Sequence, residues 1–383
     1  MEASWWKNIA DLDDDQKKAI SLDEDEDHLI VGPPGCGKTN LLLLRASYLH
    51  AKGVTNIKVL AFGRVLREFI SAGTEHYPFA ADKVQTFFRW SYEVLAANGI
   101  QIEESDNFDE VRARLFEGLK QIAEKGAAEN VFDVVLLDEA QDYSAEEAEI
   151  ISLFGARIFA VGDNNQRISE KTGALQRLEE LGATRTDLKH HYRNGIKICR
   201  VADGIKNLLD NGAGMEATSN YDEASFPSTV DVFSGVDIED QVAEAISRIK
   251  LQLQAYPGEM IGVLCPRAAE LDRAAELLGE SEIQRDIQVQ RSGAYDAIDP
   301  DRPVIVTTVQ GAKGLEFRSV HMLAAEMLKR YPTQKNLTYT AVTRAKTSLV
   351  VYHNGGLAGY FEKGLNACSI SKAVEPNLKD LFL

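Results

Sequence analysis

The sequence predicts an α/β protein of two domains, each built on a mainly parallel sheet with helices on its faces. Short apolar runs alternate with helical segments along the whole chain, as parallel strands joined by crossover helices do. A length of 383 residues suits two such domains, each large enough to bury its own core. The contents of 44% hydrophobic and 26% charged residues are ordinary for a globular protein.

The charge and the composition exclude several classes of protein. A net charge of −17 argues against bulk electrostatic coating of nucleic acid, although a local basic groove is compatible with it. No run reaches the roughly 18 apolar residues of a membrane-spanning helix, and the N-terminus is acidic where a signal peptide would be basic. Four widely spaced cysteines show no metal-ligand spacing. We therefore expect a cytoplasmic protein with reduced thiols and no membrane partner.

The strongest motif is GPPGCGKT, which follows the apolar run 29–31 and precedes a helix opened by residues 41–44. Its glycines let backbone N–H groups wrap around a phosphate, its lysine adds a cation for the β and γ oxygens, and its threonine hydroxyl can hold Mg²⁺. The motif therefore predicts binding of a nucleoside triphosphate. The residues assigned to this phosphate loop are Gly32, Pro33, Gly35, Cys36, Gly37, Lys38 and Thr39.

The first domain is expected to cover residues 1–190. A helix is expected over 5–22, entered through Asp13 to Asp15, with Gln16 near its start. Further strands are expected at 57–62, at the start of 83–99, within 156–163 and at 185–188, and further helices at 64–73, in the rest of 83–99, at 106–126 and at 173–182. The helical part from about 90 to 128 is expected to form a small insertion.

The second strong motif is VFDVVLLDEAQD, residues 131–142. An apolar run that ends in two acids predicts a central parallel strand, which delivers Asp138 and Glu139 to the carboxyl edge of the sheet. Ligands of such folds bind at this edge. One acid there can hold Mg²⁺, and its neighbour can orient the attacking water.

A second series of strands and helices begins after HHYRNG, so the second domain is expected over residues 191–383. Its expected helices are 196–210, 238–255, 267–279 and 334–346, and its expected strands are 230–233, 261–265, 304–309, 319–323 and 349–353. A loop rich in Gly, Ser and Asn is expected at 211–228.

In this order the motifs resemble those of the UvrD/Rep-like branch of the superfamily one helicases, over nearly the whole chain. The matching segments are LDDDQKKAI, GPPGCGKT, LLDEAQD, GDNNQRI, HYRN, TTVQGAKGLEF and YTAVTRAKTSLVV. The resemblance implies two RecA-like P-loop domains, with ATP and Mg²⁺ in the cleft between them. It implies catalytic roles for Lys38, Glu139, Gln166, Arg193 and Arg344, Mg²⁺ binding by Thr39 and Asp138, and nucleotide contacts by Gln16, Tyr192, Gly314 and Glu316.

Within this set, Gln16 and Tyr192 are expected on the adenine, Glu316 near the ribose and Arg193 with Arg344 on the γ-phosphate. The two arginines belong to the second half of the chain, so a bound ATP would be held between the halves. The γ-phosphate would pull the halves together, and the cleft would open after hydrolysis. Taken alone, each arginine would more often form a surface ion pair.

Candidate nucleic-acid contacts lie at strand ends that face the other surface. Aromatic rings there can stack on bases without reading sequence, but the spacing of the aromatics in 87–90 suits a buried core equally well. The candidates are Phe62, Thr86, Phe88 and Trp90 in the first domain, Lys171, and Thr308 and Gln310 in the second.

The sequence departs from the family pattern in three places. Ser169 and Lys171 stand where the family has aromatics, so Lys171 suggests a phosphate contact instead, and Gly63 stands where the family commonly has threonine. About 115 residues separate Arg193 from Thr308, which leaves no room for the large insertion of typical relatives. The ATPase motifs are complete, whereas the parts that grip single strands and split duplexes are reduced.

These departures lead to two functional hypotheses. The first is a nucleic-acid-stimulated ATPase that translocates along single-stranded DNA, 3′ to 5′ as the family does, with a protein partner that supplies the missing modules for unwinding. RNA remains an alternative to DNA. The second is an ATP-dependent switch or regulatory subunit without unwinding activity of its own. A nucleoside or small-molecule kinase is disfavoured, because it needs neither the DEAQD motif nor the two arginines.

Overall fold

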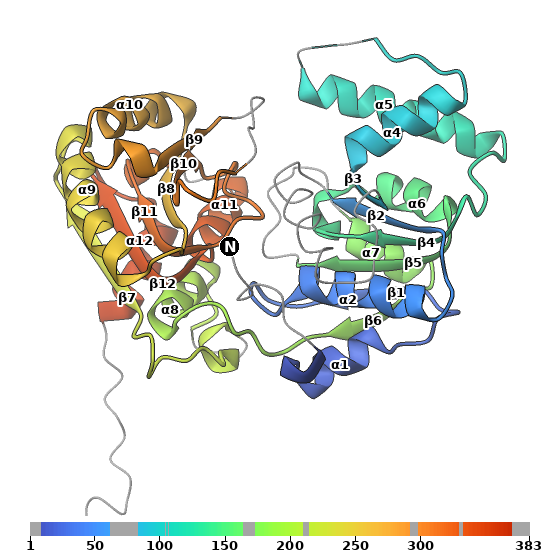
Figure 1. Ribbon diagram of the computed structural model, residues 1–383, viewed down its shortest axis with the longest axis horizontal. Helices are drawn as coiled ribbons and strands as arrows, with labels where there is room; N and C mark the ends of the chain where they lie inside the picture. Colours follow the sequence, from blue (N-terminus) through green and yellow to red (C-terminus); the bar gives the residue numbers. More distant parts are fainter. Residues whose placement is uncertain are drawn as a thin grey trace, which may run out of the picture.

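The structure is a computed structural model that describes residues 9–61, 83–103, 105, 107–163, 173–209, 214–291, 298–328 and 332–369. In these ranges the chain forms two six-stranded sheets with helices on their faces (Figure 1). All pairings between the named strands are parallel. The predicted α/β class with mainly parallel sheets is confirmed.

The first sheet has the strand order β3-β2-β4-β5-β1-β6. Its strands are β1 (His28–Val31), β2 (Ile57–Ala61), β3 (Val84–Thr86), β4 (Phe132–Leu137), β5 (Gly155–Gly162) and β6 (Thr184–Asp187). The two strands that precede the site motifs, β1 and β4, both pair with β5. Because the strands are parallel, the phosphate loop and the two acids after β4 meet at the same edge of the sheet.

Helices cover both faces of this sheet. They are α1 (Asp14–Ile20), α2 (Lys38–Ala51), α4 (Phe87–Ala97), α5 (Phe108–Glu124), α6 (Ala145–Leu153) and α7 (Ala174–Glu180). The first two share one hydrophobic core, and the other four contribute to a second core on the opposite face. The pair α4 and α5 lies together beyond β3, at the end of the sheet, where the small helical insertion was expected (Figure 1).

The second sheet has the strand order β7-β12-β11-β8-β10-β9. Its strands are β7 (Thr229–Ser234), β8 (Ile261–Cys265), β9 (Ile287–Gln290), β10 (Val304–Thr308), β11 (Phe317–Met322) and β12 (Ala345–His353). Its helices are α8 (Ile196–Lys206), α9 (Ile238–Ala255), α10 (Ala268–Gly279), α11 (Pro332–Val342) and α12 (Gly359–Ser369). One core contains α8, α11 and α12, and the other contains α9 and α10.

Most of the predicted helices are shorter in the structure, and for two of them the contacts at one end explain the difference. The helix expected over 5–22 is α1, which begins at Asp14 because the Asp13 carboxylate accepts a hydrogen bond from the Gln16 backbone N–H, 2.7 Å away, as an N-cap. The helix expected over 334–346 ends at Val342, because Ala345 already pairs with Phe317 at the start of β12. Pairing with a neighbouring strand overrides the local helical pattern there.

One strand and two α-helices of the structure were not predicted from the sequence, namely β9, α6 and α12. Among the residues that the structure describes, no helix is both long enough and apolar enough to cross a membrane.

Candidate functional site

The phosphate loop joins β1 to α2 and follows the expected form. Gly35 and Gly37 have φ angles of +76° and +86°, in the left-handed region that favours glycine. A Cβ on Gly35 would lie 2.4 Å from the Cβ of Arg193, a residue that precedes α8 and the second sheet. Glycine at position 35 therefore allows a segment from the second half of the chain to approach the loop closely.

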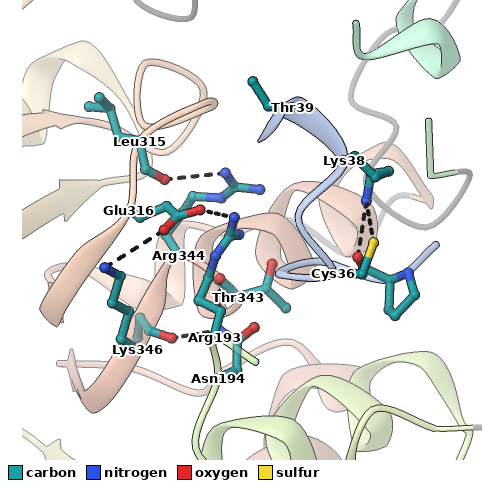
Figure 2. Close-up of polar contacts among 12 residues, drawn as sticks. Cys36, Lys38, Thr39, Arg193, Asn194, Leu315, Glu316, Thr343, Arg344 and Lys346 are labelled. Carbon is teal, nitrogen blue, oxygen red and sulfur yellow. Dashed lines mark hydrogen bonds and ion pairs between the residues drawn. The ribbon is translucent and has the colours of Figure 1, made fainter. Parts of the chain in front are cut away.

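Lys38 directs its charge into the loop. Its Nζ donates to the carbonyl oxygens of Gly32, at 2.8 Å, and Pro33, at 3.0 Å, and lies 3.8 Å from the Cys36 sulfur (Figure 2). Burial raises the pKa of the Cys36 thiol, which keeps it protonated. A glycine-rich cradle with one ammonium group at its centre fits a phosphate group.

Thr39 and Asp138 come together as the metal-site prediction requires. The Thr39 hydroxyl donates to a carboxylate oxygen of Asp138 at 2.9 Å. Burial and the neighbouring charge of Glu139 raise the pKa of Asp138 to about 7. A hydroxyl and a carboxylate are oxygen ligands of the kind that Mg²⁺ takes beside substrate phosphates, and a cation there would favour the ionised carboxylate.

Glu139 follows at the carboxyl end of β4, with a left-handed φ of +50° and an exposed fraction of only 8%. Burial opposes its ionisation, but Lys313, Arg344 and Lys38 outweigh this effect and hold the pKa of Glu139 below its ordinary value. Its carboxylate also accepts a hydrogen bond from the Gln141 amide. An ionised, oriented carboxylate in this position can hold and polarise a water molecule.

Gln141 was not singled out by the sequence analysis, although it lies inside the DEAQD motif. Its Oε1 accepts a hydrogen bond from the backbone N–H of Asp163, 2.9 Å away, directly after β5. It therefore connects the ends of β4 and β5 beside Glu139. Only the motif itself could have pointed to this residue, because the partner is 22 positions away.

The segment before α8 packs against the phosphate loop. The Tyr192 N–H donates to the Gly35 carbonyl at 3.1 Å, and the Tyr192 hydroxyl donates to the Asp13 carboxylate at the start of α1. The side chain of Gln16 donates to the Cys36 carbonyl at 2.9 Å. The two residues expected on the adenine are thus both tied to the loop region, from opposite halves of the chain.

Arg193 pairs with Glu316 in the structure (Figure 2). The other Glu316 carboxylate oxygen lies 3.8 Å from the Lys346 ammonium. Burial and the neighbouring Arg344 lower the pKa of Arg193. The sequence analysis expected Glu316 near a ribose, whereas its contacts in the structure are with these two cations.

Arg344 is almost fully buried. Its guanidinium donates to the carbonyl oxygens of Leu315, at 3.2 Å, and Thr340, at 3.3 Å. Burial lowers its pKa, and the charge of Glu139, at the end of β4, acts in the opposite direction. Figure 2 shows the guanidinium groups of Arg193 and Arg344 on the side of the second-sheet elements that faces Lys38. Both guanidinium groups thus lie on the side that faces the first half of the chain, and Arg193 lies against Gly35 of the phosphate loop.

A glycine turn, an ion pair and two hydrogen bonds hold this part of the second sheet. Gly314 has a φ of +82° in the turn before β11. The preceding Lys313 reaches across to the first sheet, where its ammonium pairs with the buried Asp142 carboxylate, and the Lys313 side chain is 11% exposed. Asn194 donates to the carbonyls of Thr343, at 2.9 Å, and Ala345, at 2.6 Å. The roles of Lys313 and Asn194 were not predicted, although both lie within quoted motifs.

The candidates for nucleic-acid contact differ in how far the structure exposes their side chains. Trp90 was wrong as a candidate for base stacking, because its side chain is 2% exposed and its ring packs edge-to-face on Phe154 with centroids 5.0 Å apart. Phe88 is half-buried against the same core, and Gln310 is exposed. Phe62, Gln166 and Lys171 lie outside the described residues, as do Gly63 and Ser169.

The two threonine candidates serve the backbone. The Thr86 hydroxyl accepts from the Arg89 N–H at 3.2 Å and caps α4, and the Thr308 hydroxyl accepts from the Gly311 N–H at 3.1 Å. Both side chains are buried. Their hydroxyl groups are therefore occupied in local turns, and neither residue presents an open surface for a strand.

Comparisons with known proteins match both halves of the chain. The AAA domain model matches residues 11–230, more than half of the chain, and the UvrD-like helicase C-terminal domain model matches residues 303–352. The crystal structure of the C-terminal domain of a possible DNA helicase from Lactobacillus plantarum WCFS1 is 20% identical, with a TM-score of 0.33. The match covers 46% of this chain and 96% of that one. No curated protein of similar sequence was found.

AAA and helicase families generally use ATP with Mg²⁺. Both family models match in the order in which the motifs occur, so the resemblance inferred from the sequence is confirmed. The chain belongs to the AAA domain family, and its residues 303–352 are similar to the UvrD-like helicase C-terminal domain.

Proposed function

We propose that this chain is a nucleic-acid-stimulated ATPase that translocates along single-stranded DNA, in the 3′ to 5′ direction of the family that it resembles. The two RecA-like domains would be residues 1–190 and 191–383, with ATP in the cleft between them and a cytoplasmic setting. The observation that carries the proposal is the convergence of Arg193, Arg344 and Lys313, from the second half, on Glu139 and the phosphate loop of the first.

The site residues divide the work of hydrolysis between the two halves. Lys38 and the loop N–H groups hold the β and γ phosphates, and Thr39 with Asp138 would hold Mg²⁺. A bound Mg²⁺ would neutralise phosphate charge and orient the oxygens. Glu139 orients the attacking water, and the arginines stabilise the charge that develops on the transferred phosphoryl group, by about 10³-fold or more in rate.

Domain movement follows from the same contacts. Arg193 lies beside the loop but pairs with Glu316, so a γ-phosphate competes with that carboxylate for its guanidinium. Loss of the γ-phosphate returns the arginine to Glu316 and removes one attraction between the halves. This alternation supplies the opening and closing that movement along a strand requires.

A second candidate function is an ATP-dependent switch without its own unwinding activity. It is favoured by the ion pairs of exposed arginines near the ends of strands. Each of the exposed residues Arg89, Arg267 and Arg291 pairs with a nearby carboxylate. Paired arginines attract phosphates less strongly than open ones. A protein partner that supplies the missing strand-binding modules would fit both candidates.

One experiment separates the candidates. ATP turnover is measured with no polymer, with single-stranded DNA, with single-stranded RNA and with duplex DNA, at two salt concentrations. The motor predicts strong stimulation by single-stranded DNA that weakens as salt rises. Turnover that is high without polymer and indifferent to every polymer would exclude the motor and favour the switch.

A further inference from the structure

The turn that follows β4 is held from two sides. Glu139 has φ +50° and ψ +44°, a conformation that a residue with a Cβ adopts only where its neighbours impose it. The Asp142 N–H donates to the Glu139 carbonyl at 2.9 Å and closes the turn. Whatever fixes Asp142 therefore also fixes the backbone of Glu139.

The first contact comes from the helical insertion. Arg112, on α5, is 3% exposed, and its Nη2 donates to the Asp142 carbonyl oxygen at 2.9 Å. The same guanidinium forms a two-point ion pair with Glu147 on α6, with Nε 2.6 Å from Oε1. Glu147 is 1% exposed and also accepts from the Ser144 N–H at 2.8 Å, at the start of α6.

A second contact joins the insertion to the same turn. The ring of Tyr143 meets the ring of Phe87, the first residue of α4, edge-to-face with centroids 5.5 Å apart. Tyr143 follows Asp142 directly. The two helices of the insertion therefore contact adjacent residues, Asp142 and Tyr143, which lie three and four positions after Glu139.

The other side of Asp142 faces the second half of the chain. Its carboxylate pairs with Lys313, and the same ammonium acts on the Glu139 carboxylate. Asp142 thus accepts a hydrogen bond from Arg112 at its backbone carbonyl and forms an ion pair with Lys313 at its side chain. The insertion, the water-orienting acid and the second half of the chain meet at this one residue.

We propose that Arg112 is a positioning residue for ATP hydrolysis, which holds the turn 139–142 so that Glu139 and Asp142 are aligned for closure by Lys313. This inference rests on the proposed ATPase function. Arg112 touches no reacting group in this account and acts only through the Asp142 carbonyl.

The test compares the ATP turnover of the unmodified full chain with that of three variants. Each rate is divided by the concentration of sites that bind ADP. Arg112→Met removes the contact but leaves the Glu147 carboxylate buried without its cation, which can impair folding. The double variant Arg112→Leu, Glu147→Leu removes both charges, and a buried pair can be replaced in this way with little loss of stability. Arg114→Met, on an exposed arginine of the same helix, is the matched control.

The positioning role predicts that kcat per ADP-binding site falls about tenfold to a hundredfold in both Arg112 variants, while KM and the affinity for ADP stay unchanged. Arg114→Met keeps the wild-type kcat. A wild-type kcat in the double variant would overturn the inference, since the Asp142 carbonyl has then lost its donor without effect. Failure of the proposed function looks different, because the unmodified chain would then hydrolyse no ATP under any condition.

Discussion

Glu139 owes its properties to three cations that come from different parts of the chain. Lys38 belongs to the phosphate loop, whereas Lys313 and Arg344 belong to the second half, and together they keep the carboxylate ionised although it is buried. A negative charge held in this way can orient water, but it contributes little to gripping a triphosphate, which is itself negative.

Glu139→Gln should therefore leave ATP binding intact and reduce turnover by roughly a hundredfold or more, since the amide cannot accept a proton from water. Binding is measured with a fluorescent ATP analogue and turnover by phosphate release. Glu146→Gln, an exposed position on α6, is the control and should keep full activity. Turnover of the Glu139 variant close to that of the control would remove Glu139 from its role.

Glu316 gives a second prediction at this scale, because the structure and the family resemblance assign it different contacts. Its carboxylate pairs with Arg193 and lies 3.8 Å from Lys346. If its main task is to hold Arg193, Glu316→Gln should change turnover of ATP and of 2′-deoxy-ATP by the same factor. A ribose contact would instead show as a loss of discrimination between these two nucleotides, measured as the ratio of their kcat/KM values.

Local motifs were sufficient to predict Lys38, Thr39, Asp138 and Glu139. A phosphate loop and an acid pair after a strand are short patterns, and chain order in a parallel sheet brings them to one edge. The contacts of Gln141 were beyond such reasoning. They join positions far apart in the chain and depend on which side-chain rotamers the packing selects.

At the scale of elements, the sheets were predicted more reliably than the helix ends. The strands β1, β2, β4, β8 and β10 each contain at least three consecutive apolar residues, as expected of strands buried on both faces. The four-residue strand β9 carries a weak signal because polar residues alternate within it. Trp90 shows a different limit of prediction from sequence. An aromatic residue at helical spacing is compatible with a buried core and with an exposed surface until its neighbours are known.

The second sheet carries a buried histidine that links three of its elements. On β11, His321 bonds the Tyr352 hydroxyl of β12 at 3.0 Å and the Gln252 amide oxygen of α9 at 2.8 Å. Burial and the charge of Arg248 lower the pKa of His321 to about 3. The folded protein therefore keeps this ring neutral at a pH where the unfolded chain takes up a proton.

The free energy of unfolding should fall as pH drops below about 6.5, because only the unfolded state then gains a proton at this position. The loss continues towards the folded pKa, at up to about 1.4 kcal/mol per pH unit. His321→Gln keeps hydrogen-bonding capacity but cannot titrate, so its slope between pH 6.5 and 4.5 in urea unfolding should be shallower. The two proteins should have equal slopes above pH 7, and equal slopes at acidic pH would contradict the assignment.

At the scale of the whole molecule, several contacts of the described residues join the two halves at the phosphate loop and at the turn after β4. The Tyr192 backbone meets Gly35, the Arg193 backbone lies against the same glycine, and Lys313 pairs with Asp142. The expectation that residues of both halves meet at a shared nucleotide site came from the family resemblance of the motifs. Its geometry depends on domain packing, which no local pattern specifies.

The most direct measurement compares the affinities for a non-hydrolysable ATP analogue and for ADP in the wild type, in Arg193→Gln and in Arg344→Gln, with exposed Arg285→Gln as control. If both halves hold the same triphosphate, each of the two arginine variants should bind the ATP analogue roughly tenfold or more weakly, with ADP affinity nearly unchanged, because ADP lacks the γ-phosphate. Unchanged affinity for the triphosphate in both variants, or an equal loss for the two nucleotides, would contradict a nucleotide site shared by the two halves of the chain.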